Sequence, residues 1–163
     1  MATYTLWLGQ YEKFAAASGE HIELPGQYSG KVRPQPESHI RIVNFDPTIL
    51  VMSSLRKPKR LTILGSDERS HNYLVKGGED LRMDQRVEQV FCTMNEILAS
   101  DTAAARRALS LRTYQVIPFS PTMGMLEWVP DTEPLKGLLL SDASLQLTMN
   151  KMSNKFNELL ATL

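Results

Sequence analysis

Short runs that are either wholly apolar or alternate between apolar and polar residues fill the centre of the chain and predict β-strands. Four such runs follow one another closely, at residues 39–43, 49–52, 60–64 and 72–75. No helix-sized segment separates them, and a parallel neighbour would need a crossover of about a dozen residues or more, so we expect antiparallel pairing. Residues 113–119 and 125–129 predict a further hairpin, with Ser-Pro-Thr-Met-Gly as its turn.

The strongest helical pattern lies at residues 84–99. Apolar residues recur there every three or four positions and form one stripe: Val87, Val90, Phe91, Met94, Ile97 and Leu98. Polar residues fill the opposite side: Gln85, Arg86, Gln89 and Glu96. This pattern is typical of a helix that packs its apolar side against a core. We therefore expect a long helix packed on the predicted sheet.

Weaker helical patterns flank these elements. Residues 3–17 carry aromatic residues at helical spacing, and residues 101–111 begin at Asp101, a residue type that caps helices. Residues 135–140 predict one or two helical turns. The apolar positions near the end of the chain alternate steps of four and three: Leu145, Met149, Met152, Phe156, Leu159 and Leu163. With the strands, these helices predict an α+β fold.

Composition and charge exclude several classes of protein. The hydrophobic fraction of 42% and the charged fraction of 22% are those of a globular chain. Lys and Arg number 18 against 18 Asp and Glu, which argues against a generally basic nucleic-acid binder. Cys92 is the only cysteine, and the three histidines are isolated, so we expect neither a disulfide nor a metal site. An intracellular compartment is expected.

The segment around Lys76 is the main candidate for chemistry. This lysine leaves a predicted strand, Gly77 and Gly78 turn the chain, and the carboxylates of Glu79, Asp80 and Asp84 lead into the long helix. A lysine at a strand end close to a helix start is one way to place a cation on a phosphate. The alternative is structural: Asp84 caps the helix, Lys76 extends into solvent, and the glycines only form a turn.

Two other features have a structural and a functional interpretation. Residues 56–60 (Arg-Lys-Pro-Lys-Arg) form a basic run between two strands, either a solvated turn or a nucleic-acid patch. Tyr114 and Trp128 place aromatic rings on neighbouring strands, either as core residues or as a wall for a base. The common glycine-rich nucleotide-binding motifs are absent from the sequence.

Several co-linear motifs carry a resemblance to a known family. Residues 74–82 (Leu-Val-Lys-Gly-Gly-Glu-Asp-Leu-Arg), followed by residues 84–89 (Asp-Gln-Arg-Val-Glu-Gln), resemble the signature of the phosphatidylinositol-3-kinase-related protein kinases. Residues 24–28, 54–60 and 109–114 strengthen the match, which covers about residues 4–140. The resemblance implies a protein-kinase-like small lobe, in which an antiparallel sheet carries a packed long helix and flanking helices. Met83 departs from the glutamine usual in this family.

The resemblance also implies roles for individual residues. Ser54 would contact phosphate from a strand turn, and Lys76 would pair with the ATP phosphates, oriented by Asp84 alone or together with Glu79. The adenine pocket would be formed by aromatic and apolar side chains: Tyr114, Trp128, Met52, Leu74 and Leu126. The backbone of Glu127 and Val129 would supply the hinge hydrogen bonds.

The motifs of a kinase large lobe are missing. Neither the catalytic loop nor an Asp-Phe-Gly motif occurs, so we expect no catalytic residue in this chain and expect Mg²⁺ to be held by the second lobe. The chain is expected to be a fragment with three segments: a preceding helix and connector (1–36), the small lobe and hinge (37–140), and an amphipathic C-terminal helix (141–163). It is expected to be inactive in isolation.

The resemblance carries expectations about biology as well. It implies a nuclear serine/threonine protein kinase that acts in double-strand break repair by non-homologous end joining. The partners would be the missing large lobe and, through other parts of a full-length protein, Ku and DNA ends. The alternative is a stand-alone, non-enzymatic interaction module that uses the same fold.

Overall fold

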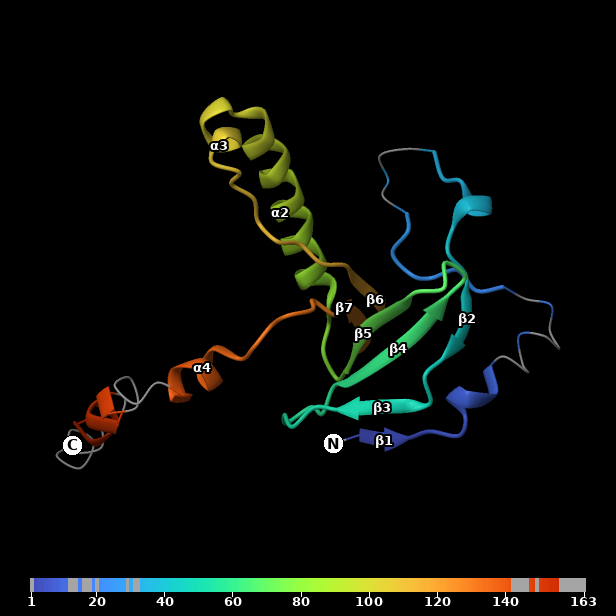
Figure 1. Ribbon diagram of the computed structural model, residues 1–163, viewed down its shortest axis with the longest axis horizontal. Coiled ribbons are helices and arrows are strands. Elements are labelled where there is room, and N and C mark those ends of the chain that lie inside the picture. Colours follow the sequence, from blue (N-terminus) through green and yellow to red (C-terminus); the bar gives the residue numbers. More distant parts are fainter. Residues whose placement is uncertain are drawn as a thin grey trace. The chain divides into compact units, whose positions relative to one another are not determined.

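The computed structural model describes residues 2–11, 15, 19, 21–28, 30, 33–141, 147–148 and 150–155. The chain forms two compact units, residues 1–128 and 129–163, and each is described by itself (Figure 1). Among its described residues, the first unit holds a sheet and the helices α2 and α3. The second holds a short helix and further helical residues towards the end of the chain.

An antiparallel sheet is the centre of the first unit (Figure 1). Its described strands are β1 (Ala2–Tyr4), β2 (Ile42–Phe45), β3 (Thr48–Val51), β4 (Lys59–Gly65), β5 (Ser70–Gly77), β6 (Val116–Ser120) and β7 (Met123–Glu127). The strand order is β1-β3-β4-β5-β7-β6, and β2 pairs with the far end of β4. The predicted strands and their antiparallel pairing are confirmed, although β2 begins three residues later than expected. The predicted hairpin is also confirmed, but its first strand begins at Val116 and its turn is shorter than expected.

The two faces of this sheet differ, because side chains two residues apart on a strand share a face. One face, here called the core face, buries Ile63, Tyr73 and Met125 from the three central strands. Leu24 from the N-terminal connector and Ile42 complete this cluster. The opposite face, here called the α2 face, carries the smaller buried cluster of Leu81, Val116 and Leu126.

The prediction of a helix over residues 3–17 is wrong at its start. Ala2–Tyr4 form β1, which pairs with β3, and Leu8–Gln10 form a single 3-10 turn, η1. The β-favouring Thr-Tyr-Thr sequence gains backbone hydrogen bonds at the sheet edge that a helix start would leave unpaired. Trp7 is 76% exposed, and Phe14 lies outside the described residues.

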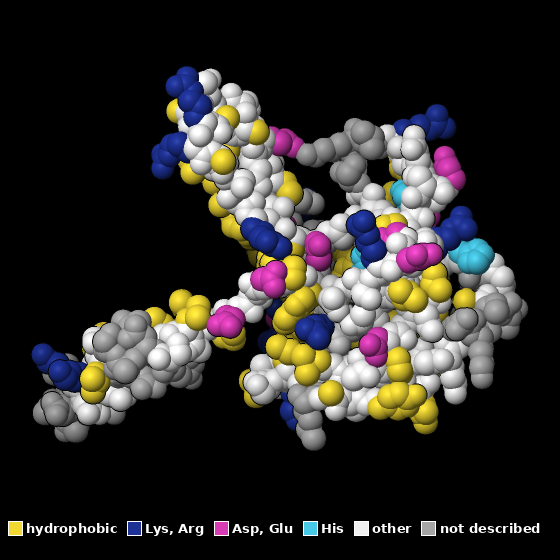
Figure 2. Space-filling model, in the orientation of Figure 1, with side chains coloured by type: hydrophobic (Ala, Val, Ile, Leu, Met, Phe, Trp, Pro, Cys, Tyr) yellow, Lys and Arg dark blue, Asp and Glu magenta, His cyan; other side chains and the backbone are white. Residues whose placement is uncertain are grey.

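Helix α2 (Arg82–Ser100) confirms the predicted long helix, but only part of its apolar stripe packs, since Phe91 and Leu98 are half-buried. Val87, Val90, Met94 and Ile97 are all more than 40% exposed, and Figure 2 shows hydrophobic side chains at the surface of α2. Glu88, a charged residue, is buried. The polar side of α2 contacts its neighbours through hydrogen bonds, which the stripe alone could not indicate.

The helix expected over residues 101–111 is shorter than predicted. Asp101 caps α3 (Thr102–Arg106) as expected, since its side chain accepts a hydrogen bond from the Ala104 N–H at 2.8 Å. Ala108 then adopts a left-handed backbone conformation with φ 50°, which ends the helix. The following residues run as an irregular segment to β6.

The second unit contains α4 (Leu135–Ser141), which confirms the helical turns predicted at residues 135–140. Residues 147–148 and 150–155 are helical, in agreement with part of the predicted C-terminal helix. Its other apolar positions lie outside the described residues: Leu145, Met149, Phe156, Leu159 and Leu163. Across the described residues, no helix has the length and apolar character needed to span a membrane.

Candidate functional site

Strand register brings the predicted site residues of β5 and β7 to the α2 face. Leu74 of β5 pairs with Leu126 of β7, and Lys76 lies two residues further along β5. Trp128 continues the same ladder, since its N–H donates to the Asn72 carbonyl at 2.9 Å. Leu74, Lys76, Leu126 and Trp128 therefore share one face of the sheet.

Glu79 is the carboxylate beside Lys76. The Lys76 Nζ lies 3.8 Å from Glu79 Oε1, and about a quarter of the lysine side chain is exposed (24%). Gly78 adopts φ 77° between them, a conformation that glycine allows at little cost and that returns the chain towards β5. The turn thus holds a carboxylate three residues after the lysine and keeps the ammonium group at the α2 face.

Asp84, the other carboxylate expected to orient Lys76, has a different neighbour. It lies exposed in the first turn of α2, and the described residues show no ion pair between it and Lys76. Its charge acts on Tyr114 instead. The pKa of the Tyr114 phenol is raised, mainly by burial and further by the negative charges of Glu88 and Asp84.

Polar side chains of α2 hold the segment that contains Tyr114. Glu88 Oε2 accepts a hydrogen bond from the Tyr114 N–H at 3.2 Å. Asn95 bonds to both the N–H and the carbonyl of Leu111, at 2.7 Å and 2.8 Å. Gln85 donates to the Val116 carbonyl at 3.4 Å. Glu88 and Asn95 were missed from the sequence, although the spacing of these three polar residues places them on one side of a helix.

Arg60 is a further residue of this face that sequence reasoning missed. Its guanidinium lies 5.2 Å from the centroid of the Trp128 ring, within the range of a cation–π contact. Next to it, Thr62 donates to the Asn72 side chain at 2.7 Å. The Arg60 contact places a cation beside the Trp128 ring on this face. Tyr114 packs instead against the cluster of Leu81, Val116 and Leu126, so the two expected wall residues have different neighbours.

The turn between β3 and β4 carries Met52, Ser54 and the basic run. The Met52 N–H donates to the Pro58 carbonyl at 2.9 Å and closes the turn. Ser54 is exposed within it, and its carbonyl accepts from the Lys57 N–H at 3.0 Å. Arg56 reaches out of the turn and donates to the Gly78 carbonyl at 2.8 Å. The turn therefore touches the β5–α2 connection beside Lys76.

The two expected hinge residues lie in different units. The Glu127 N–H donates to the Gln115 carbonyl at 2.8 Å, and the Glu127 carboxylate accepts from the Gln115 N–H at 3.0 Å. Because the Glu127 carboxylate accepts the hydrogen bond from the Gln115 N–H, the Glu127 backbone carbonyl does not accept it. Val129 begins the second unit, where its carbonyl accepts a hydrogen bond from Thr132 Oγ1 at 3.1 Å.

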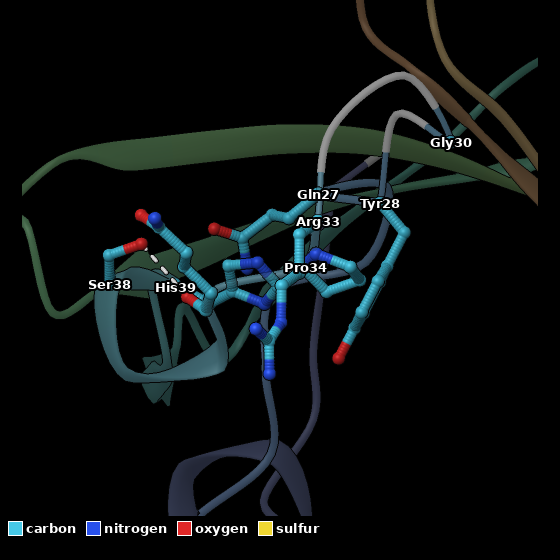
Figure 3. A pocket seen from close by; sticks show the side chains of 8 residues that line it. Gln27, Tyr28, Gly30, Arg33, Pro34, Ser38 and His39 are labelled. Carbon is cyan, nitrogen blue, oxygen red and sulfur yellow. Dashed lines mark hydrogen bonds between the residues drawn. The ribbon is translucent and has the colours of Figure 1, made fainter.

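A hollow lies away from these residues, in the N-terminal connector (Figure 3). Gln27, Tyr28, Arg33 and His39 contribute to its lining. His39 Nδ1 lies 2.8 Å from Glu23 Oε2, and the hydrogen bonds from His39 and Tyr28 lower the pKa of the Glu23 carboxyl. None of the residues predicted for nucleotide binding lines this hollow. It is a separate feature of the connector.

Comparison with known families supports the resemblance. The sequence model of the family described as phosphatidylinositol 3- and 4-kinase matches residues 70–160, which is more than half of the chain. The matched region begins at β5 and includes Lys76, α2 and the β6–β7 hairpin.

Individual relatives narrow the match. The chain is 45% identical over 156 residues to the DNA-dependent protein kinase catalytic subunit of Dictyostelium discoideum, and 50% identical over 141 residues to that of Mus musculus. It is 42% identical over 127 residues to the serine/threonine-protein kinase tor1 of Schizosaccharomyces pombe. These alignments cover 96%, 86% and 78% of this chain but only 4%, 3% and 5% of the relatives.

Solved structures show the same fold. The FAT and kinase domain of CtTel1 matches with a TM-score of 0.71 and 28% identity, covering 90% of this chain and 11% of that one. The open conformation of CtTel1 matches with a TM-score of 0.68 and 29% identity, covering 85% of this chain and 5% of that one. The chain therefore belongs to the phosphatidylinositol 3- and 4-kinase family, within which it resembles the phosphatidylinositol-3-kinase-related protein kinases.

Proposed function

We propose that this chain is the ATP-binding small lobe of a serine/threonine protein kinase and that the nucleotide binds on the α2 face. The observation that carries the proposal is the placement of Lys76 at the end of β5, beside Glu79 and on the same face as Leu74, Leu126 and Trp128. A cation at the edge of an apolar and aromatic surface matches a ligand with a phosphate chain at one end and a base at the other.

Each part of the site would contribute a separate interaction. Lys76 would stabilise the negative charge of the phosphates, and the Ser54 turn would cover them. Met52, Leu74 and Leu126 would bury the adenine, with Tyr114 and Trp128 as its aromatic walls. The Glu127 carbonyl would accept a hydrogen bond from the base. The expected hydrogen bond to the Val129 backbone stays a prediction, since that residue belongs to the second unit.

Phosphoryl transfer requires more than these residues. The reaction also needs a group that holds Mg²⁺ against the phosphates and a base that accepts the proton of the substrate hydroxyl. The kinase motifs that supply these groups, the catalytic loop and Asp-Phe-Gly, do not occur in this sequence. We infer that the chain binds ATP weakly and transfers no phosphate by itself.

The similarity to DNA-dependent protein kinase catalytic subunits supports a proposal about the larger protein. It would act in the nucleus, in double-strand break repair by end joining, with Ku and DNA ends as partners. The similarity to the tor1 serine/threonine-protein kinase supports the kinase activity alone. Loss of end joining in cells that lack the gene would support the repair role, and intact end joining would contradict it.

A second candidate function is a non-enzymatic interaction module. The exposed apolar stripe of α2 favours it, because a contiguous apolar surface commonly marks a contact with another protein. Nucleotide binding separates the two proposals. An interaction module has no need for Lys76, whereas the kinase lobe depends on it.

The test is calorimetric titration of the chain with ATP, in the wild type and in Lys76→Ala. A matched control is Lys59→Ala, which removes an exposed cation from β4, the strand next to β5, at a position on the core face. We expect ATP binding in the wild type and the control and a loss of about tenfold or more in Lys76→Ala. Equal affinity in all three proteins, or no binding in any, would contradict the proposed function.

A further inference from the structure

The hollow in the N-terminal connector is lined by polar side chains that form no part of the proposed nucleotide site. Its lining includes Tyr28, Arg33, Ser38 and His39, and its volume is about 480 Å³ (Figure 3). The rim is open, because Tyr28 is 60% exposed and both Arg33 and Ser38 are exposed as well. A ligand in this hollow would therefore stay partly in contact with solvent.

Several polar groups of the lining already use their protons within the chain. The side-chain amide of Gln27 makes three hydrogen bonds to backbone groups, at 2.8, 2.8 and 2.7 Å. The Tyr28 hydroxyl donates to Glu23 Oε2 at 2.9 Å, and the Ser38 hydroxyl donates to the Gln35 carbonyl at 2.8 Å. These three side chains shape the hollow but have no proton left to donate to a ligand.

His39 is the most buried polar side chain of the four named, with 10% of its side chain exposed. Its Nδ1 lies 2.8 Å from Glu23 Oε2. Because an ionised carboxylate only accepts hydrogen bonds, Nδ1 carries the proton of this pair, and Nε2 is the nitrogen left for a ligand. Nε2 has no partner among the described residues, and these contain no fully buried side-chain nitrogen or oxygen without one. Nε2 is therefore open to the hollow that His39 lines.

Arg33 supplies a second unused donor group. Its side chain lines the hollow, and no ion pair or hydrogen bond to it occurs within the part of the chain that the structure describes. A guanidinium carries five N–H donors in one plane, and two of them can bind the two oxygens of a carboxylate. Arg33 and His39 therefore offer a planar cation and a ring nitrogen to an anion in the hollow (Figure 3).

The charge of Glu23 decides which anion fits. Hydrogen bonds from His39 and Tyr28 lower the pKa of the Glu23 carboxyl, so this group is ionised at neutral pH. With Arg33 and a protonated His39, the hollow then carries a net charge of about +1. A carboxylate, which has one negative charge, balances this arrangement. A phosphate with two negative charges would place excess negative charge close to Glu23.

We propose that the connector hollow binds the side-chain carboxylate of an acidic peptide segment, with Arg33 donating to both oxygens and His39 Nε2–H donating to one of them. A peptide side chain fits better than a free small molecule, because small-molecule sites bury most of their ligand and this rim is exposed. The exposed Tyr28 ring gives the rest of the peptide an apolar surface. The inference goes beyond the proposed function and does not depend on ATP binding.

The test is an NMR titration of the chain with isotopically labelled histidine rings, in which the His39 signals are assigned from their absence in His39→Gln. The probes are the blocked peptide acetyl-Gly-Glu-Gly-Glu-Gly-amide, the same peptide with glutamine in place of glutamate, acetate and inorganic phosphate. The other variants are Arg33→Ala, Arg33→Lys and Arg69→Ala. Arg69, an exposed arginine in the β4–β5 turn, controls for the loss of one positive charge. Thermal unfolding shows whether each variant is folded, and the exposed Arg33 keeps the test valid if His39→Gln is unstable.

We expect the glutamate peptide to shift the His39 signals with millimolar affinity and the glutamine peptide to bind about fivefold more weakly or less. Arg33→Ala should weaken binding of the glutamate peptide by about fivefold or more. Arg33→Lys should recover part of this loss, because it restores the charge without the planar donors. Arg69→Ala should match the wild type.

Binding should also weaken by about fivefold or more from about pH 5.5 to about pH 8, because His39 Nε2 loses its proton over this range. The groups around His39 keep their charge there. The pKa of the Glu23 carboxyl is lowered, the pKa of the Tyr28 phenol is raised, and Arg33 and Arg41 stay cationic. His39→Gln should remove the pH dependence.

Four results would overturn the inference. Unshifted His39 signals at about 20 mM glutamate peptide would show that the hollow is not a binding site. Equal binding of the glutamine peptide, or an equal loss in Arg69→Ala and Arg33→Ala, would show that the hollow does not recognise a carboxylate. Tighter binding of phosphate than of the glutamate peptide would assign the hollow to a different anion. Acetate binding as tight as that of the peptide would contradict the assignment to a peptide segment.

Discussion

The core face and the α2 face of the sheet use the same strands for different purposes. On the core face, Ile63, Tyr73 and Met125 are less than 5% exposed and pack against the N-terminal connector. On the α2 face, the same strands present Arg60, Lys76 and Trp128, which remain partly accessible. The alternation of a β-strand therefore separates stability from chemistry: one face supplies the core, and the other is free to carry charged groups.

The α2 face also differs from the core face in the interactions that stabilise it. Its apolar cluster is small, and the segment that carries Tyr114 is tied to α2 by hydrogen bonds from Glu88 and Asn95. Side chains here satisfy backbone groups that have no strand neighbour. The difference predicts that substitutions on the core face affect folding strongly, whereas those on the α2 face affect binding more than folding.

The largest expected effect comes from neighbouring residues on opposite faces of β4. Ile63 is 2% exposed on the core face, and Leu64 is 39% exposed on the other. We expect Ile63→Ala to lower the free energy of unfolding by about 2–5 kcal/mol, because it leaves a cavity in the core. Leu64→Ala should cost less than about 1 kcal/mol. Urea denaturation measures both values, and similar losses would contradict the asymmetry of the faces.

A smaller loss of stability is expected from a substitution at Gly124, the point where Leu81 lies close to the sheet. A Cβ at Gly124 would lie 2.7 Å from the Ile117 carbonyl oxygen and 2.9 Å from Leu81 Cδ1. Gly124→Ala should therefore lower the free energy of unfolding by about 1–3 kcal/mol. Gly77 is the control, since its Cβ would have no atom within 4 Å. Denaturation curves should separate the two variants, and equal stability would show that the Leu81 contact tolerates displacement.

Alkaline pH should destabilise the core face through Tyr73. Burial, with a smaller contribution from the charge of Glu127, raises the pKa of the Tyr73 phenol to about 12. In the unfolded chain the group ionises near pH 10, so the unfolded state loses this proton first and the free energy of unfolding falls as pH rises from about 10 to 12. The expected loss from this group is about 2 kcal/mol.

Tyr73→Phe isolates this effect, because the other tyrosines titrate in both proteins. The two proteins should respond alike below about pH 9 and diverge above pH 10, with the wild type losing more stability. The variant also removes the 3.4 Å hydrogen bond to the Pro25 carbonyl, which shifts its curve by a constant amount at lower pH. Parallel curves up to pH 12 would show that the Tyr73 hydroxyl is not buried in the folded state.

The sequence predicts the central strands well because their alternation is local information. It fails for β1, since a three-residue edge strand depends on pairing with β3, more than forty residues away. It locates α2 but only part of the side that packs, because periodicity shows where apolar residues lie and not what covers them. For the same reason it predicts Glu79 beside Lys76, close in sequence, but not the contact of Glu79 with Arg56 across two turns.

Residues that act on the backbone are the hardest to predict. Glu88 looks like one more charged residue of an amphipathic helix, and only the path of residues 109–116 shows that its carboxylate binds the Tyr114 N–H. Arg60 is part of a basic run that suggests a solvated turn, yet its position opposite Leu74 places it over the Trp128 ring. Both roles depend on which residues of distant segments lie next to each other in the fold, and the local sequence pattern does not show this.

Hydrogen–deuterium exchange of the chain with and without ATP tests most directly whether the α2 face binds the nucleotide. We predict slower exchange in the β3–β4 turn (residues 52–58) and in the segment before β6 (residues 109–116), and no change in residues 22–28 of the connector. Lys76→Ala should abolish the protection. Protection confined to the connector hollow near Gln27 and His39, with no change in the β3–β4 turn, would contradict the assignment of the site to the α2 face.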